Sequence, residues 1–140
     1  MPRHETCAWG FPSRDQWPVD DDVVAVGADL APDTLLYAYT HGMFPMHIDR
    51  KHETLGWFSP LTRGVIPIDG LHVTKSMRRS ARNFNVTSDM AFTDVMRYCA
   101  MTRTDGNWID DEFIETYSVL HAMGQARKST RLNSSHVKRS

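Results

Sequence analysis

Four basic side chains recur at helical spacing in the middle of the chain: Lys75, Arg78, Arg79 and Arg82. Positions i, i+3, i+4 and i+7 lie on one face of a helix. No Asp or Glu is interleaved, so these charges repel one another by roughly a few tenths of a kcal/mol per pair. A phosphate backbone would relieve that repulsion. The segment therefore predicts a phosphate-binding helix face, or alternatively a solvated charged face with no partner.

Two aromatic–proline segments flank a polar connector between Gly42 and Pro60. They are Phe44-Pro45 and Trp57-Phe58-Ser59-Pro60. Proline fixes φ and pushes the preceding residue toward extended geometry, so each segment holds its aromatic rings on a stiff backbone. If the two segments face each other, they suit the wall of a pocket for a flat or apolar ligand group. The alternative is that these rings simply pack into the core.

Trp108 precedes the last expected helix, where a Trp forms either a core plug or a pocket wall. Tyr117 lies about two and a half turns further along that helix. Both residues could face the aromatic–proline segments.

The residues alone predict neither a metal site nor a self-contained catalytic set. His41, His47 and His52 are the only close histidines, and their spacing is not that of a zinc site. The chain has no glycine-rich phosphate loop and no nucleophile motif. The acidic run that begins at Asp110 stands at a helix start, where the helix dipole explains it without catalysis. We therefore expect no metal and no cofactor.

Composition places the chain among globular proteins. Its 140 residues are 41% apolar with a net charge of −1, enough for one modest domain or for parts of two. No apolar run approaches the roughly 18–20 residues of a membrane span, and the first residues do not resemble a signal peptide. Cys7 and Cys99 form no CxxC motif, which fits a reducing cytoplasm. Local basic patches without overall positive charge exclude a general nucleic-acid coat but allow a grip on a short stretch of backbone.

Periodicity and turn signals predict alternating helices and strands. The expected strands are Val23–Val26 (or an extended turn), Gly64–Ile68 (placed at an edge or bulge by Pro67) and Phe84–Thr87. The expected helices run from Pro32 to a stop at Gly42, from the cap Thr74 to about Arg82, from the cap Asp89 through Cys99, and from Asp110 or Asp111 to Gly124. Cys99 falls on the apolar face of the third helix and is expected to be buried. Asp105-Gly106-Asn107 is expected to be a turn.

The character of the chain changes at Arg127. Residues 127–140 have no apolar period and are biased toward Ser, Arg and Lys. We expect this segment to be a disordered tail or translated linker sequence outside the native fold.

Several ordered blocks together resemble a known family. The blocks are Val26-Gly27-Ala28-Asp29-Leu30, Ala38-Tyr39, Gly42-Met43-Phe44-Pro45, Gly56-Trp57-Phe58-Ser59-Pro60, Arg63-Gly64-Val65, Leu71-His72-Val73, Lys75-Ser76-Met77-Arg78-Arg79, Gly106-Asn107-Trp108-Ile109 and Tyr117-Ser118-Val119-Leu120-His121. With their spacing, they resemble the leucyl/phenylalanyl-tRNA–protein transferases from about residue 23 to residue 126.

This resemblance implies a cytoplasmic aminoacyltransferase. Such enzymes transfer leucine or phenylalanine, sometimes methionine, from aminoacyl-tRNA to the N-terminal Arg or Lys of a protein, which marks it for degradation by the N-end rule. The implied fold is α+β: a small N-terminal α/β domain (1–62), then the start of a domain like the GCN5-related N-acetyltransferases (63–126). The implied partners are aminoacyl-tRNA and acceptor proteins, with no metal, cofactor or membrane.

The resemblance also implies roles for particular residues. Trp108 and Met46 are expected to form walls of the side-chain pocket, Met46 at a position often occupied by Trp. Tyr39 and Tyr117 are expected near the terminal adenosine of the tRNA. The basic face of Lys75, Arg78, Arg79 and Arg82 is expected to meet the tRNA backbone near its 3′ end.

The likeness ends before the strands that carry the family's proton-transfer residues. We therefore expect no catalytic residue in this chain, which resembles a truncated fragment of the enzyme that is poorly active alone. Two other interpretations stay open at this point. One is a non-catalytic tRNA- or RNA-binding module, and the other is a structural domain whose aromatic rings are only core.

Overall fold

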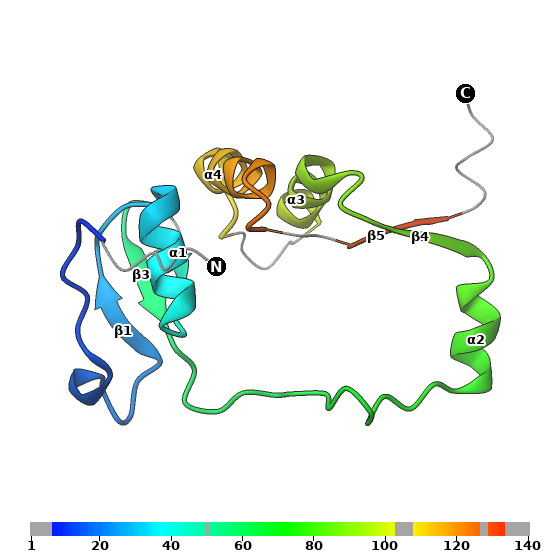
Figure 1. Ribbon diagram of the computed structural model, residues 1–140, viewed down its shortest axis with the longest axis horizontal. Coiled ribbons are helices and arrows are strands. Elements are labelled where there is room, and N and C mark those ends of the chain that lie inside the picture. The colour runs from blue at the N-terminus through cyan, green and yellow to red at the C-terminus, as the bar shows by residue number, and fades with distance from the viewer. Residues whose placement is uncertain (1–6, 50, 103–107, 127–128, 134–140) are drawn as a thin grey trace.

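The computed structural model describes residues 7–49, 51–102, 108–126 and 129–133 (Figure 1). In chain order its elements are η1 (Arg14–Gln16), β1 (Val23–Val26), α1 (Pro32–Thr40), β2 (Phe44–His47), β3 (Leu55–Phe58), α2 (Lys75–Ala81), β4 (Phe84–Ser88), α3 (Phe92–Met101), α4 (Asp111–Ala122) and β5 (Ser129–Asn133). This mixture of helices with antiparallel strands confirms the α+β prediction. No helix in the described part of the chain is long and apolar enough to span a bilayer.

An antiparallel sheet in the order β1-β3-β2 opens the fold. In its β2–β3 pair, Phe44 lies opposite Phe58 and Pro45 lies opposite Trp57. The two aromatic–proline segments therefore do face each other, but as paired strands that the sequence analysis did not predict. β2 is an edge strand, which is where a sheet tolerates proline.

Helix α1 covers this sheet and ends as its sequence predicts. Pro32 is the first helical residue, where its missing N–H costs nothing. Gly42 follows the helix with φ of 85°. The Gly42 amide donates to the Tyr39 carbonyl at 3.1 Å, and the Met43 amide donates to the Ala38 carbonyl at 2.9 Å. These two bonds form a Schellman motif, which needs the left-handed conformation that glycine adopts freely.

Trp57 is the centre of the first part of the core. Its side chain is 0% exposed, and its Nε1 donates to the Gly27 carbonyl at 2.9 Å. Phe11 packs edge-on against it, with ring centroids 4.9 Å apart. For Trp57 the core interpretation of the aromatic–proline segments is therefore correct.

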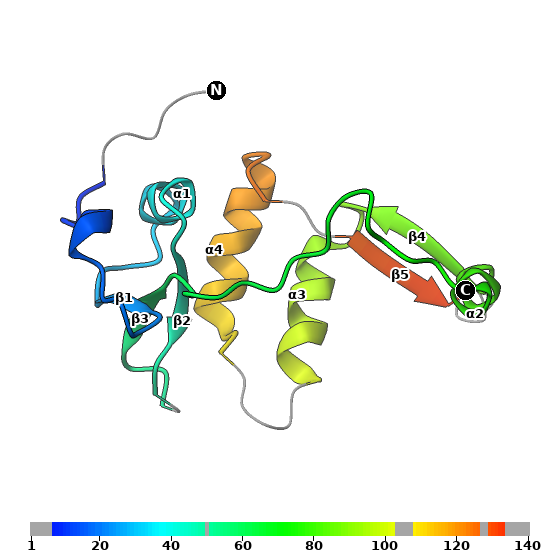
Figure 2. The same cartoon turned by 90° about the horizontal axis from the view of Figure 1, so that it is seen from below.

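The same core continues into the later helices. Phe92 and Met96 of α3 and Phe113 and Leu120 of α4 join the buried cluster that contains Trp57. In both views α4 lies in the middle: the sheet and α1 are on one side of it, and α3 is on the other (Figures 1 and 2). Helix α4 is therefore the element that connects the two parts of the chain.

Residues 59–74 run from the sheet to α2 without helix or strand (Figure 1). The strand predicted over Gly64–Ile68 is therefore wrong. Val65 and Ile66 are 79% and 73% exposed, and no described strand lies beside them to pair with their backbone. A β-branched run becomes a strand only where a neighbour accepts its hydrogen bonds. Helix α2 itself is confirmed, because the Thr74 hydroxyl accepts from the Met77 amide at 3.1 Å.

Two expectations for α3 are also wrong. The helix begins at Phe92 after Ala91, whereas Asp89 has φ of 60° and does not cap it. Cys99 is exposed, because α3 buries only Phe92 and Met96. The apolar face of this helix is thus narrower than its sequence indicates.

Strand β4 is confirmed, and it pairs with β5 over Phe84↔Asn133 to Ser88↔Ser129. Residues 129–133 therefore form a strand, whereas the whole segment 127–140 was expected to be disordered. Its other residues lie outside the described part of the chain, as does the turn expected at 105–107.

Replacing Trp57 by Phe should destabilise the protein by about 2 kcal/mol, because it leaves a cavity and removes the hydrogen bond to Gly27. Urea unfolding followed by far-UV circular dichroism measures this change. Trp9→Phe is the matched control, because Trp9 is 46% exposed. Equal losses from the two variants would contradict a central packing role for Trp57.

Candidate functional site

A row of aromatic rings crosses from α1 to the start of α4. Trp108 packs edge-on against Phe113 with centroids 5.3 Å apart, and Phe113 stacks with Tyr117 at 5.9 Å. Tyr117 in turn meets Tyr39 of α1 edge-on at 6.4 Å. Three of the four predicted pocket residues therefore lie in one connected row, with Phe113 as the link between them.

The two tyrosine hydroxyls hydrogen-bond each other at 2.5 Å. Burial raises the pKa of Tyr39, and the bond to Tyr117 offsets only part of that rise. Burial also raises the pKa of Tyr117, and the neighbouring Tyr39 raises it further. Both hydroxyls are therefore protonated at neutral pH, and neither is a base. One of the two hydroxyls donates its hydrogen to the oxygen of the other. The hydrogen of the accepting hydroxyl is therefore free to be donated to a ligand oxygen.

Met46, the fourth predicted pocket residue, lies on β2 opposite Gly56. Side chains alternate along a strand, so Met46 shares the sheet face of Phe44, whose ring stacks on Phe58 at 6.0 Å. The adjacent His47 points the other way and meets Phe113 edge-on at 5.3 Å. The structure thus joins His47, and not Met46, to the aromatic row.

Asp110 binds two separate parts of the fold with its two carboxylate oxygens. Oδ1 accepts from the Phe113 amide at 3.0 Å and caps α4. Oδ2 accepts from His47 Nε2 at 2.9 Å and from His52 Nδ1 at 3.2 Å. Burial raises the pKa of Asp110, but these three hydrogen bonds outweigh it and the net pKa lies below the ordinary value. We call His47, His52 and Asp110 the bridging cluster.

The loop that carries His52 is organised by Asp49. Its carboxylate accepts backbone N–H bonds from Lys51 at 2.8 Å, Glu53 at 3.2 Å and Thr54 at 2.6 Å. The hydrogen bond from Glu53 is the largest of the effects that lower the pKa of Asp49 to about 2. His52 adopts φ of 60° in this loop. Its ring stacks on His47 with centroids 4.6 Å apart.

The nitrogen and oxygen atoms of the bridging cluster lie within 4.8 Å of one another, close enough to test as metal ligands. The ring nitrogens of His47 and His52 both contact Asp110 Oδ2 directly, at 2.9 and 3.2 Å, as hydrogen bonds. His47 Nδ1 is buried with no hydrogen-bond partner among the described residues, whereas a metal-bound His needs an acceptor for that second N–H. The cluster fits direct hydrogen bonding better than metal coordination, and the absence of a metal stays a prediction.

The same observation assigns the proton of His47. A proton on Nδ1 would leave a buried N–H unsatisfied at a cost of about 1–3 kcal/mol, whereas a proton on Nε2 is donated to Asp110. We therefore assign the Nε2–H tautomer, in which His47 is a donor to the carboxylate.

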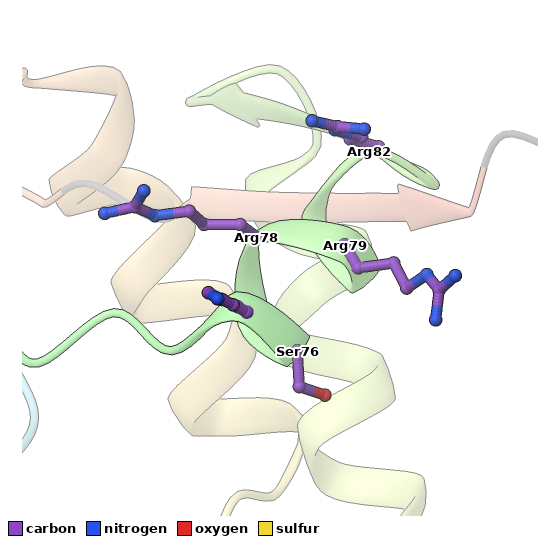
Figure 3. Close-up of a pocket in the computed structure, with 5 residues that line it drawn as sticks. Ser76, Arg78, Arg79 and Arg82 are labelled. Carbon is purple, nitrogen blue, oxygen red and sulfur yellow. The ribbon is translucent and has the colours of Figure 1, made fainter.

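The basic face of α2 lies apart from the aromatic row. Lys75, Ser76, Arg78, Arg79 and Arg82 line a hollow of about 490 Å³. Arg78 and Arg79 extend to opposite sides of the helix, and Arg82 points away from both (Figure 3). The charges therefore do not converge on one small anion, and they suit several phosphates spaced along a chain.

Sequence reasoning missed Phe113 and the bridging cluster as site residues. The sequence did predict Asp110 as a possible start of a helix, but as a structural feature only. His47 and His52 stand 63 and 58 residues before Asp110, so no local pattern joins them.

Asp49→Asn should change how stability depends on pH. The pKa of Asp49 is depressed, so its stabilisation is complete above the unfolded value of about 3.9 and is lost as pH falls toward about 2. The stability difference between wild type and variant should shrink across that window. Urea unfolding from pH 6 to pH 2.5 measures it. Glu53→Gln, in the same loop, is the control, and a pH-independent difference for Asp49→Asn would contradict the assignment.

Two family models match the chain. The leucyl/phenylalanyl-tRNA protein transferase N-terminal domain matches residues 28–61, and leucyl/phenylalanyl-tRNA protein transferase matches residues 65–135. The second match begins just after the sheet and includes α2, α3 and α4.

Curated relatives carry the name leucyl/phenylalanyl-tRNA–protein transferase. The protein of Alcanivorax borkumensis is 44% identical over 110 residues, which cover 76% of this chain and 45% of the relative. The protein of Sulfurimonas denitrificans is 40% identical over 110 residues (76% and 47%), and that of Tolumonas auensis is 38% identical over 121 residues (83% and 51%). The chain spans about half the length of these relatives. The family match runs through both the sheet and α4, and on this evidence the chain belongs to the leucyl/phenylalanyl-tRNA–protein transferase family.

Proposed function

We propose that this protein serves in the transfer of leucine or phenylalanine, and in some cases methionine, from aminoacyl-tRNA to the N-terminal Arg or Lys of an acceptor protein. Membership of the family is the observation that carries the proposal. The product would be a protein marked for degradation by the N-end rule in the cytoplasm.

The proposed reaction is the aminolysis of an ester. The α-amino group of the acceptor attacks the aminoacyl carbonyl, a C–N bond forms, and the C–O bond to the tRNA ribose breaks. The amine loses a proton, and the departing ribose oxygen gains one. Because the ester is already activated, the protein needs only to align the reactants, accept a proton and stabilise the oxyanion. A metal or redox cofactor is not required.

We propose the aromatic row as the binding site of the aminoacyl end. Trp108, whose ring is backed by the buried ring of Phe113, supplies apolar surface that can contact a leucine or phenylalanine side chain. The free O–H of the Tyr39–Tyr117 pair can donate to an oxygen of the terminal ribose. Met46 joins this pocket only if the ligand reaches around the edge strand β2. Discrimination by such contact is limited, since one methylene is worth about 1–3 kcal/mol.

We propose the α2 face as the contact to the tRNA backbone near its 3′ end. Its four cations are exposed, and the helix stands away from the rest of the described fold (Figure 1). An exposed helix leaves room for a bulky nucleic acid that a buried cluster would exclude.

We further propose the two-domain organisation, with residues 1–62 as the N-terminal domain and 63–126 as the start of a domain like the GCN5-related N-acetyltransferases. Proton transfer is assigned to no residue of this chain. The chain is thus proposed to contribute substrate binding.

Filter binding with leucyl-tRNA, followed by transfer of labelled leucine to a peptide that begins with Arg, tests the proposal. Retention of leucyl-tRNA in preference to uncharged tRNA supports it. Failure to bind either RNA contradicts it. Binding without transfer is the result expected of a chain that contributes substrate binding and holds no proton-transfer residue.

Replacing both Arg78 and Arg79 by Ala should weaken tRNA binding and flatten its salt dependence. Four phosphate contacts give a slope of log K against log salt of about −3, and two give about −1.5. Fluorescence anisotropy from 50 to 300 mM KCl measures the slope.

The matched control is Lys51→Ala with Arg97→Ala, which removes the same charge from exposed positions outside α2. An unchanged slope in the α2 variant, or an equal change in the control, would refute the phosphate-binding role.

A further inference from the structure

We propose that Asp110, held by His47 and His52, is a positioning residue that sets the place of Trp108 in the aminoacyl pocket and so controls recognition of the amino-acid side chain. This inference rests on the proposed function of the aromatic row. It concerns residues that sequence reasoning did not connect.

The carboxylate of Asp110 joins two elements that are distant in sequence. One oxygen fixes the first turn of α4 through the Phe113 amide. The other oxygen fixes that turn to the end of β2 and to the loop after it, through His47 and His52. Because hydrogen bonds are directional and both carboxylate oxygens are engaged, the carboxylate sets both the distance and the rotation of α4 relative to β2.

Both histidines reach the carboxylate from rigid surroundings. His47 has only 7% of its side chain exposed, and its ring lies between the His52 ring and the edge of Phe113. His52 projects from the loop that Asp49 holds through three backbone bonds. Because both histidines are held in place, loss of their hydrogen bonds to Asp110 should displace the first turn of α4 and not the histidines.

Trp108 is linked to Asp110 by one residue, the buried Ile109. Trp108 also packs on the Phe113 ring, whose amide Asp110 binds. A shift of Asp110 away from β2 therefore moves Trp108 through the backbone and Phe113 through the helix. Tyr117, farther along α4, is hydrogen-bonded to Tyr39 of α1. These two tyrosines, proposed to meet the adenosine, should therefore move less than Trp108.

The test compares Asp110→Asn with Asp111→Asn. Asparagine caps helices about as well as aspartate, so the variant at 110 keeps the bond to Phe113. Its NH₂ group would face the N–H donors of His47 and His52. Because two donors cannot hydrogen-bond each other, the hydrogen bonds from both histidines are lost. Asp111→Asn removes the same charge from the same turn at an exposed position.

A second variant, His52→Asn, tests the same contact if Asp110→Asn fails to fold. Asparagine tolerates the left-handed conformation of His52, so the loop is kept while the ring is lost.

The probes are 3′-phenylalanylamino-3′-deoxyadenosine and its alanyl analogue, which share the nucleoside and the amine and differ in side chain. Calorimetry on the 140-residue chain gives the ratio of their dissociation constants. We expect Asp110→Asn to weaken phenylalanyl binding by about tenfold, the effect of losing contact equal to one methylene, with little change for the alanyl probe. His52→Asn should give a smaller change of the same kind.

Each outcome separates the inference from the function on which it rests. A ratio of the phenylalanyl to the alanyl dissociation constant that rises for Asp110→Asn and not for Asp111→Asn supports the positioning role. Equal ratios in all variants, or equal loss of both probes, overturn it and leave the proposed pocket standing. If the wild-type chain binds neither probe, the pocket fails and the inference fails with it.

Discussion

The arrangement of the fold depends on the buried ring of Phe113. This ring is 0% exposed and contacts His47, Trp108 and Tyr117. Burying such a ring stabilises the protein by about 1.5–3 kcal/mol relative to leaving it in water. Because its partners come from β2, from α4 and from the residues before α4, the contacts of this ring join both parts of the chain. The candidate site is built around these contacts.

Hydrogen bonds at two points of α4 fix the orientation of this helix on the sheet. Hydrophobic burial has no preferred orientation, so Phe113 alone would allow α4 to slide or rotate on the sheet. Asp110 fixes the first turn to β2, and the Tyr117 hydroxyl fixes a later turn to Tyr39 of α1. Two fixed points on one helix remove both motions. Apolar burial thus supplies attachment, while the hydrogen bonds supply the geometry that a binding site needs.

The features that sequence analysis predicted correctly are those determined by near neighbours. The stop of α1 at Gly42 and the cap of α2 at Thr74 each depend on residues a few positions away. The β2–β3 pairing was missed because Pro45 and Gly56 argue against strands unless the sheet edge is known. The buried face assigned to Cys99 was wrong because periodicity shows which residues share a helix face, but not how much of that face a neighbour covers.

The candidate site divides in the same way. The helical spacing of the basic face is local, and the structure confirms that helix. Tyr39 and Tyr117 hydrogen-bond each other, and sequence analysis did not predict this contact. The bridging cluster joins residues about 60 positions apart, so its signal exists only in three dimensions.

Pro67 has a consequence for the solubility of the chain. It lies between Ile66 and Ile68, in a segment whose apolar side chains are open to solvent. Exposed β-branched runs promote intermolecular β-pairing and aggregation. Proline has no backbone N–H, so a strand from another molecule that aligns here lacks a hydrogen bond at the centre of the run. The same ring that weakens this segment as a strand protects it from becoming the seed of a fibril.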